Sequence, residues 1–178
     1  REFEKGRRAV NRSVRAQAPA KVNLHLEVIR RRHDGYHEVE TILQAVQIFD
    51  DLRVTLVEEF PGGPPRIELT VDSDQRIPAD ETNLCWRAAE HFCRQTGRSG
   101  SVVMHLEKRI PAAAGLGGGS SNAATVLKGL NAFYGSPVPQ KDLYAIGKGI
   151  GADVPFFIYG KPAMATGIGD ILTPCDCI

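Results

Sequence analysis

The sequence has no apolar run that approaches the about 18 residues needed to span a bilayer, and no hydrophobic secretory leader. It also has no internal repeat and no low-complexity segment. These absences argue against a membrane-spanning protein, a repeat protein and a disordered chain. Apolar residues make up 42% of the 178 residues and charged residues 24%, which is ordinary for a globular domain. We therefore expect a soluble, intracellular protein with a buried core.

Cysteine is scarce, and its spacing is not that of a metal site. Cys85 and Cys93 are eight positions apart on a predicted helix, while Cys175 and Cys177 form a C-x-C pair near the end of the sequence. Zinc sites use closely spaced pairs such as C-x2-C, repeated or combined with histidines. The sequence therefore assigns no metal ligand.

The charge of the chain is nearly balanced, at +1. Residues 1–15 contain six basic and two acidic residues, a net of +4, so the remainder carries about −3. A nucleic-acid-binding domain would place its basic residues over a folded face rather than at one terminus. We expect residues 1–15 to be a basic N-terminal extension, and no nucleic acid or membrane partner.

Periodicity predicts an α+β domain. Alternating residues predict strands at 14–30, 38–46, 52–58, 67–71 and 101–108, with a hairpin turn at Asp34-Gly35. Helical spacing predicts helices at 83–96, ended by Gly97, and at 141–150. The apolar segment 154–159 has the composition of a strand.

In the first strand, alternation places Val22, Leu24, Leu26 and Val28 toward the core. Lys21 and Asn23 then share the opposite face, away from the core.

The segment I-P-A-A-A-G-L-G-G-G-S-S-N-A-A, residues 110–124, predicts a phosphate-binding loop. Glycines allow positive φ and a close approach of the backbone to an anion. Ser120 and Ser121 can cap a helix over 122–134, and the free N–H groups of a helix start favour phosphate. A P-loop would need Gly-Lys-Ser/Thr, and a dinucleotide fingerprint would need glycine at position 120, so neither explains the spacing. An ordinary glycine-rich turn is the plain alternative.

Three polar clusters lie beside turns or strand ends, and each has a plain alternative. Lys21 beside Asn23 can be a solvated strand residue. Tyr36 and His37 can stack on and hydrogen-bond to a base, or simply follow an Asp-Gly turn. Asp153, which precedes the apolar segment, can be a cap or turn residue.

Together these motifs resemble those of the GHMP small-molecule kinases. Within that superfamily, A-P-A-K-V-N-L-H-L-E-V, R-R-H-D-G-Y-H-E-V-E-T, K-R-I-P-A-A-A-G-L-G-G-G-S-S-N-A-A and I-G-A-D-V-P-F-F are similar to the 4-diphosphocytidyl-2-C-methyl-D-erythritol kinase family of the non-mevalonate isoprenoid pathway. The resemblance extends from Ala18 to Pro174, where G-I-G-D-I-L-T-P also fits, and D-G-Y-H narrows it beyond the superfamily. It implies a GHMP-kinase N-terminal domain (ribosomal protein S5 domain 2-like), a mixed β-sheet with helices packed on one side.

The resemblance also implies roles for individual residues. Asp153 is expected to accept the proton of the attacking hydroxyl, Lys21 to hold that hydroxyl and the carboxylate in register, and Asn23 to bind substrate near the reacting end. Tyr36 and His37 are expected to hold the cytosine. ATP is expected to contact Pro111, Gly115, Leu116, Gly117, Gly118, Gly119, Ser120 and Ser121, with Lys108 and Asn122 as weaker contacts. Mg²⁺ is expected from the chemistry, with its ligands unassigned.

Two departures from the family pattern affect these expectations. Ala112, Ala113 and Ala114 stand where relatives often have glycine, so a positive φ there would be strained. The sequence ends at Ile178, whereas the family continues into a second domain with a further glycine-rich motif. We expect residues 16–160 to form the ATP- and substrate-binding domain and 161–178 to begin the link to that second domain. The alternatives are an active kinase and a truncated, non-catalytic domain that binds nucleotide or associates with another chain, itself included. Bacterial cytoplasm and plastid stroma both fit the pathway.

Overall fold

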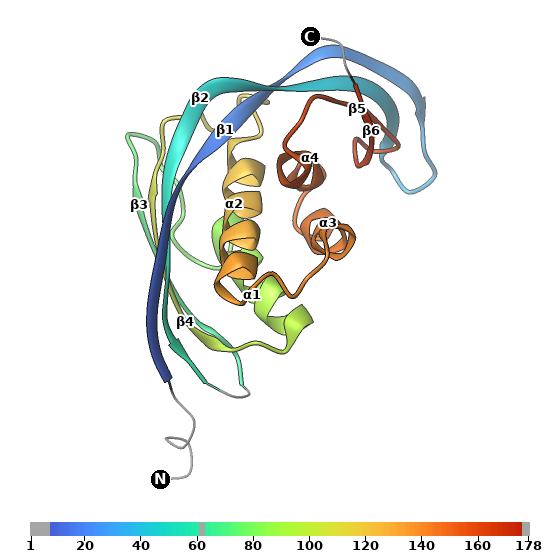
Figure 1. Cartoon of the computed structure of the whole chain (residues 1–178). Coiled ribbons are helices and arrows are strands. Elements are labelled where there is room, and N and C mark those ends of the chain that lie inside the picture. Colours follow the sequence, from blue (N-terminus) through green and yellow to red (C-terminus); the bar gives the residue numbers. More distant parts are fainter. Residues whose placement is uncertain (1–7, 61–62, 176–178) are drawn as a thin grey trace.

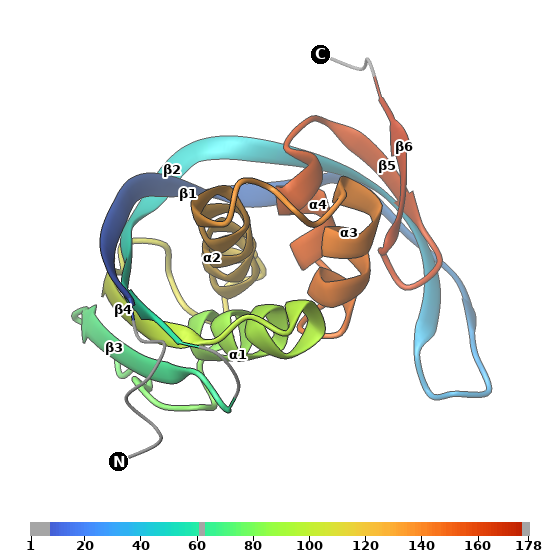
Figure 2. The same cartoon turned by 60° about the horizontal axis from the view of Figure 1, so that its bottom comes forward.

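The computed structural model describes residues 8–60 and 63–175 and shows one curved sheet with helices on its concave side (Figure 1). The strand order is β3-β4-β2-β5-β6, and β1 pairs with β2. The pair β3–β4 is parallel and the other pairs are antiparallel, so the sheet is mixed. The α+β class and the one-sided helix packing that the sequence predicted are confirmed (Figure 2). The elements are β1 Arg8–Arg31, β2 His37–Glu59, β3 Arg66–Asp72, α1 Leu84–Thr96, β4 Gly100–Glu107, α2 Gly118–Phe133, α3 Gln140–Lys148, α4 Val154–Tyr159, β5 Ala163–Thr166 and β6 Ile171–Pro174.

The long ribbon formed by β1 and β2 is the main framework of the sheet. The predicted hairpin is confirmed, with Gly35 at a φ of 86°. The two strands predicted at 38–46 and 52–58 are instead one strand, β2, with an irregularity where the register moves from Pro19 opposite Phe49 to Ala20 opposite Val46. The buried positions of β2 are odd-numbered before this irregularity and even-numbered after it. A break in alternation of this kind looks like a strand end when only the sequence is available.

Strand β1 begins at Arg8, inside the segment predicted to be an extension. Residues 8–15 pair with β2 in regular register apart from one shift, while residues 1–7 lie outside the described part of the chain. Because β1 is an edge strand, basic side chains such as Arg12 can stay in solvent while the backbone pairs. The boundary predicted from composition, between residues 15 and 16, therefore lies too far along the sequence.

The predicted orientation of the β1 side chains is wrong for most of them, although Asn23 is exposed as predicted. Leu24, Leu26 and Val28 are exposed by 52%, 58% and 57%, whereas Lys21 is only 6% exposed. The hairpin end of the ribbon extends past the helices (Figure 1), so apolar side chains there have nothing to pack against. A register shift between Asn23 and His25 also interrupts the alternation on which the prediction depended.

The core lies between the sheet and the helices. Its largest fully buried side chains include Phe92 of α1, Leu127 of α2 and Phe156 of α4. Helix α1 agrees with the prediction, because Asn83 caps it by accepting a hydrogen bond from the Cys85 amide at 2.9 Å. No helix in the described ranges is long and apolar enough to cross a membrane.

Residues 154–159 form helix α4 and not the predicted strand. Pro155 suits the first turn of a helix, where its missing N–H is not needed. A β-carbon on Gly147 of α3 would lie 2.8 Å from Val154 Cγ1, so the glycine allows the two helices to touch. A short apolar run that is buried all round does not distinguish a strand from a helix.

The segment 161–178, predicted to begin a link, contributes two strands to the same sheet. Strand β5 pairs with β2 through Ala163 opposite Leu43, and β6 pairs with β5. Residues 176–178 lie outside the described part of the chain.

Candidate active site

The predicted catalytic pair is brought together although its members are 132 positions apart in the sequence. Lys21 Nζ lies 3.5 Å from Asp153 Oδ2. The lysine side chain is 8% exposed and the carboxylate side chain 32%, so the pair is open to solvent from the Asp153 side only. The backbone N–H of Lys21 also donates to Leu116 O at 2.9 Å, which ties the glycine loop to β1.

A chain of hydrogen bonds orients the lysine from the other side. Lys21 Nζ donates to Asn23 Oδ1 at 2.7 Å, and Asn23 Nδ2 donates to Thr41 Oγ1 at 2.7 Å. Thr41 Oγ1 in turn donates to His25 O at 2.6 Å. Thr41 was not predicted, because its place beside Asn23 depends on the register of β1 against β2. The chain fixes the Asn23 amide with its oxygen toward the ammonium.

Helix α2 begins earlier than predicted, at Gly118 rather than at residue 122. Its N-cap is Gly117 at a φ of 68°, and no side chain caps it, so the predicted capping by Ser120 and Ser121 is wrong. Only glycine fits at 117: a β-carbon there would lie 3.0 Å from Lys21 Cγ and from two ring atoms of Phe157. The glycine loop thus packs directly against Lys21.

The expected strain in the alanines is present at one position. Ala113 has a φ of 56°, in the left-handed region. Gly115 has a φ of 73°, and a β-carbon added to it would meet nothing within 4 Å. The loop from Pro111 to Gly115 is exposed, and the Ala112 amide donates to Gln75 Oε1 at 2.8 Å.

Two buried polar atoms at the start of α2 lack a hydrogen-bond partner. They are Ser121 Oγ and Asn122 Oδ1, in residues only 1% and 2% exposed. Buried polar atoms without partners are rare in native proteins and call for an explanation such as a bound ligand, ion or water. Both residues were predicted to contact ATP.

A groove of about 340 Å³ runs beside the glycine loop. One wall is the loop and the first turn of α2, and the other is apolar, with Ile77, Leu84 and Leu106 among its residues. Lys108 lines the groove, and its Nζ donates to Asp50 Oδ2 at 2.5 Å. Asp50 was not predicted, because its side chain reaches this place only through the irregularity in β2.

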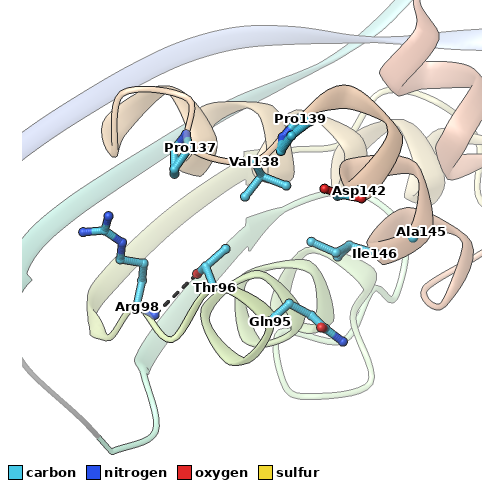
Figure 3. Close-up of a pocket in the computed structure, with 9 residues that line it drawn as sticks. All are labelled: Gln95, Thr96, Arg98, Pro137, Val138, Pro139, Asp142, Ala145 and Ile146. Atoms are coloured by element: carbon cyan, nitrogen blue, oxygen red, sulfur yellow. Dashed lines mark hydrogen bonds between the residues drawn. The ribbon is translucent and has the colours of Figure 1, made fainter.

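A second cavity, of about 500 Å³, lies at the opposite end of α1 (Figure 3). It is lined by Arg98, Val138, Asp142 and Ile146 among others, and the Arg98 amide donates to Thr96 Oγ1 at 3.4 Å. It contains none of the predicted site residues.

Tyr36 and His37 lie at the hairpin end of the ribbon and are exposed, Tyr36 by 60%. The turn is shaped by Arg32, whose amide donates to Tyr36 O at 2.8 Å, and by Asp34, which accepts from the Tyr36 amide at 3.2 Å. The Arg32 guanidinium holds the pKa of the Asp34 carboxyl below its usual range. Within the described residues no hydrogen bond or ion pair joins Tyr36 or His37 to Lys21 or Asp153.

The fold of the chain is that of a GHMP-kinase N-terminal domain. Residues 83–161 match the family described as "GHMP kinases N terminal domain". The fold class that the sequence predicted is therefore confirmed.

The relatives narrow the comparison to one kind of GHMP kinase. The chain is 44% identical over 160 residues to a "4-diphosphocytidyl-2-C-methyl-D-erythritol kinase" of Geobacter sulfurreducens. The aligned region covers 90% of this chain and 55% of that protein. The chain is 46% identical over 163 residues to a protein of the same name in Desulfotalea psychrophila, covering 90% and 52%. The predicted resemblance is confirmed, and the chain spans about half the length of the curated relatives it matches.

Solved structures agree with this assignment. A crystal structure of 4-(cytidine 5'-diphospho)-2C-methyl-D-erythritol kinase has a TM-score of 0.72 at 42% identity, covering 91% of this chain and 55% of that one. Homoserine kinase from Cytophaga hutchinsonii has a TM-score of 0.61 at 20% identity, covering 86% and 48%. The second likeness shows the fold alone.

Proposed function

We propose that this chain supplies the ATP-binding and catalytic residues of a kinase that phosphorylates the 2-hydroxyl of 4-diphosphocytidyl-2-C-methyl-D-erythritol, a step in isoprenoid precursor synthesis. The observation that carries the proposal is the Lys21–Asp153 pair, held at 3.5 Å beside the glycine loop. The names of the relatives and of the 42% identical structure support the choice of substrate.

Asp153 is the base in this proposal. Its carboxylate is one-third exposed, so a hydroxyl can reach it, and the Lys21 ammonium lies 3.5 Å away. It accepts the proton of the substrate hydroxyl as the oxygen attacks the γ-phosphorus. Phosphoryl transfer passes through a loose transition state, so positioning matters more than the strength of the base.

Lys21 has the complementary role of holding charge and geometry. Its ammonium is fixed between Asn23 Oδ1 and the Asp153 carboxylate, and so it is directed at the place where the attacking oxygen must lie. A fixed cation there stabilises the negative charge that develops on the transferred phosphoryl group. Asn23 contacts the substrate beside it.

The glycine loop and the start of α2 hold the phosphates. Residues 118–121 open a 16-residue helix, whose first N–H groups have no partner within the helix and attract anions. The apolar wall of the groove, with Ile77 and Leu84, suits the flat face of a base. In this proposal ATP is the nucleotide, and Lys108, Pro111 and the residues from Gly115 to Asn122 lie along its path.

Mg²⁺ fits the donor atoms at this place. The described residues contain no group of three or more His, Cys, Asp or Glu side chains that could hold a metal. Kinases commonly hold Mg²⁺ through one or two protein oxygens and the substrate phosphates, and Ser121 Oγ and the Asp153 carboxylate are oxygen donors of that kind. When bound, the ion neutralises charge on the phosphates.

Tyr36 and His37 hold the cytosine, by stacking and by edge hydrogen bonds. Their exposure leaves both side chains free for a base.

The whole reaction also draws on the part of the relatives that this chain does not match, so we include the further domain among the partners of the site. The second candidate is a domain that binds nucleotide without turnover. A soluble enzyme of this pathway acts in bacterial cytoplasm or plastid stroma.

The test is ADP release by the 178-residue chain with Mg-ATP and the cytidine-diphosphate substrate. Asp153→Asn keeps the size of the side chain and removes the base, so turnover should fall by at least about 100-fold. Asp142→Asn, in an exposed position on α3, is the matched control and should behave as the unmodified chain. An Asp153→Asn variant with full turnover would exclude Asp153 as the base. ATP binding without turnover in the unmodified chain would favour the second candidate.

A further inference from the structure

Asp50 is a fully buried carboxylate at a position where the fold would otherwise place an apolar side chain. It is 0% exposed and follows the irregularity in β2, which puts it in the same core-facing phase as Leu52 and Val54. A buried carboxylate is costly unless charge and hydrogen bonds compensate it. Bulges often redirect side chains next to active sites.

Among the residues that the structure describes, the hydrogen-bond partners of the Asp50 carboxylate come from three consecutive residues. Its Oδ2 accepts from Lys108 Nζ at 2.5 Å, and its Oδ1 accepts from the backbone amides of Arg109 at 2.7 Å and Ile110 at 2.8 Å. These three residues immediately precede Pro111, where the exposed loop begins. Asp50 therefore fixes the point at which the chain enters the glycine loop.

The far end of the loop is fixed to the neighbouring strand. Leu116 O accepts from the Lys21 amide, and Asp50 lies opposite Ala18 in the β1–β2 register. Lys21 is three residues from Ala18, or about 10 Å along β1. The two ends of the loop are thus attached to one short stretch of the ribbon that also presents the catalytic lysine.

Lys108, which lines the nucleotide groove, neutralises the charge of the Asp50 carboxylate. A β-carbon on Gly118 would lie 2.9 Å from Lys108 Nζ, so the ammonium sits against the first turn of α2. An uncompensated carboxylate at this distance would repel phosphates.

We propose that Asp50 is a positioning residue: through its bonds to the Arg109 and Ile110 amides it sets the glycine loop relative to Lys21 for nucleotide binding. The nucleotide part of this inference rests on the proposed function. Asp50 itself faces the core, and the hydrogen bonds of its carboxylate go to the segment that leads into the loop.

The experiment compares two double variants that differ in whether residue 50 carries a carboxamide with its acceptor oxygen. Asp50→Asn/Lys108→Met keeps an oxygen for the two amides, whereas Asp50→Ala/Lys108→Met removes it, and neither leaves a charge buried. The single variant Asp51→Asn is the control, because Asp51 pairs with the Arg109 side chain at 2.8 Å from a partly exposed position. Amide hydrogen exchange is measured over residues 115–121, with α3 as the internal reference, and ATP affinity by calorimetry.

We expect exchange over residues 115–121 to be about tenfold faster or more in Asp50→Ala/Lys108→Met than in Asp50→Asn/Lys108→Met, with α3 unchanged. ATP affinity should be about tenfold weaker in the alanine variant, and Asp51→Asn should match the unmodified chain. Residues 115–121 make no bond to Asp50, so faster exchange there reports the position of the loop and not merely the lost bonds.

Equal exchange over residues 115–121 in the two double variants would overturn the proposal. So would faster exchange throughout the chain, α3 included, because that would show a general loss of stability. If the unmodified chain binds no ATP, the proposed function fails, and the exchange comparison still decides whether Asp50 positions the loop.

Discussion

Replacing Gly117 by alanine tests how closely the glycine loop is fitted to Lys21. Gly117 has a φ of 68°, and an alanine in that conformation costs about 1–2 kcal/mol. Its β-carbon would also lie 3.0 Å from Lys21 Cγ and from Phe157 Cε2 and Cζ, all of them packed in the protein interior. Overpacking of this kind typically costs about 1–3 kcal/mol. The free energy of unfolding should therefore fall by about 2–5 kcal/mol in Gly117→Ala.

Gly115→Ala is the matched control for this variant. Gly115 has a similar φ of 73° but nothing within 4 Å of the place of a β-carbon, so only the conformational cost of about 1–2 kcal/mol applies. Both substitutions reduce the freedom of the unfolded chain equally, and that effect cancels in the comparison.

Urea unfolding of the two variants measures the difference directly. We expect Gly117→Ala to be less stable than Gly115→Ala by about 1–3 kcal/mol, and to bind ATP more weakly because Lys21 and Phe157 must move. Equal destabilisation of the two variants would refute the reasoning, since it would mean that the contact with Lys21 and Phe157 imposes no constraint.

Two further outcomes follow from the exposed hairpin and from the β5–β6 turn. Tyr36→Ala should weaken binding of the cytidine-diphosphate substrate, measured by calorimetry, by about 1–3 kcal/mol. Tyr36→Phe is the control, because it keeps the stacking ring. Unchanged substrate binding in the alanine variant would make Tyr36 a turn residue only. Burial raises the pKa of Asp170, but hydrogen bonds from Lys148 and the Ile168 amide outweigh it, so the pKa lies below its usual value. A lowered pKa means that Asp170 stabilises the fold above the unfolded-state pKa of about 4 and that this contribution is lost as the pH falls through the folded-state value. Thermal unfolding between about pH 7 and pH 3 should therefore show a smaller acid loss in Asp170→Asn than in the unmodified chain, and parallel curves would show that Asp170 does not contribute.

Short-range signals in the sequence were sufficient for the elements with local causes. Asp34-Gly35 predicted the hairpin, Asn83 and Gly97 marked the ends of α1, and alternation located β3 and β4. The glycine run predicted a loop that leads into a helix, and this loop precedes α2, while its binding of phosphate stays a prediction. These features depend on a few adjacent residues, and their physical causes are visible in the sequence.

Helix α4 and the orientation of β1 depended on the tertiary structure. Residues 154–159 are apolar on all sides, and only their burial against α2 and α3 makes them a helix. Lys21 was assigned to solvent by alternation, yet it is buried because the helices lie on its side of the sheet and do not reach the hairpin. Neither the extent of helix cover nor a shift in register appears in a periodic pattern.

The sequence by itself determined which residues are candidates for the chemistry: Lys21, Asp153 and the glycine loop are specified by their type and their motifs. The tertiary structure decided how they meet. It closed a separation of 132 positions to 3.5 Å, added Thr41 behind Asn23, and placed Asp50 beneath the entrance of the loop. The reason is that contacts between strands depend on register and bulges. A one-residue slip in register moves every side chain of a strand to the other face, and no local stretch of sequence records the register.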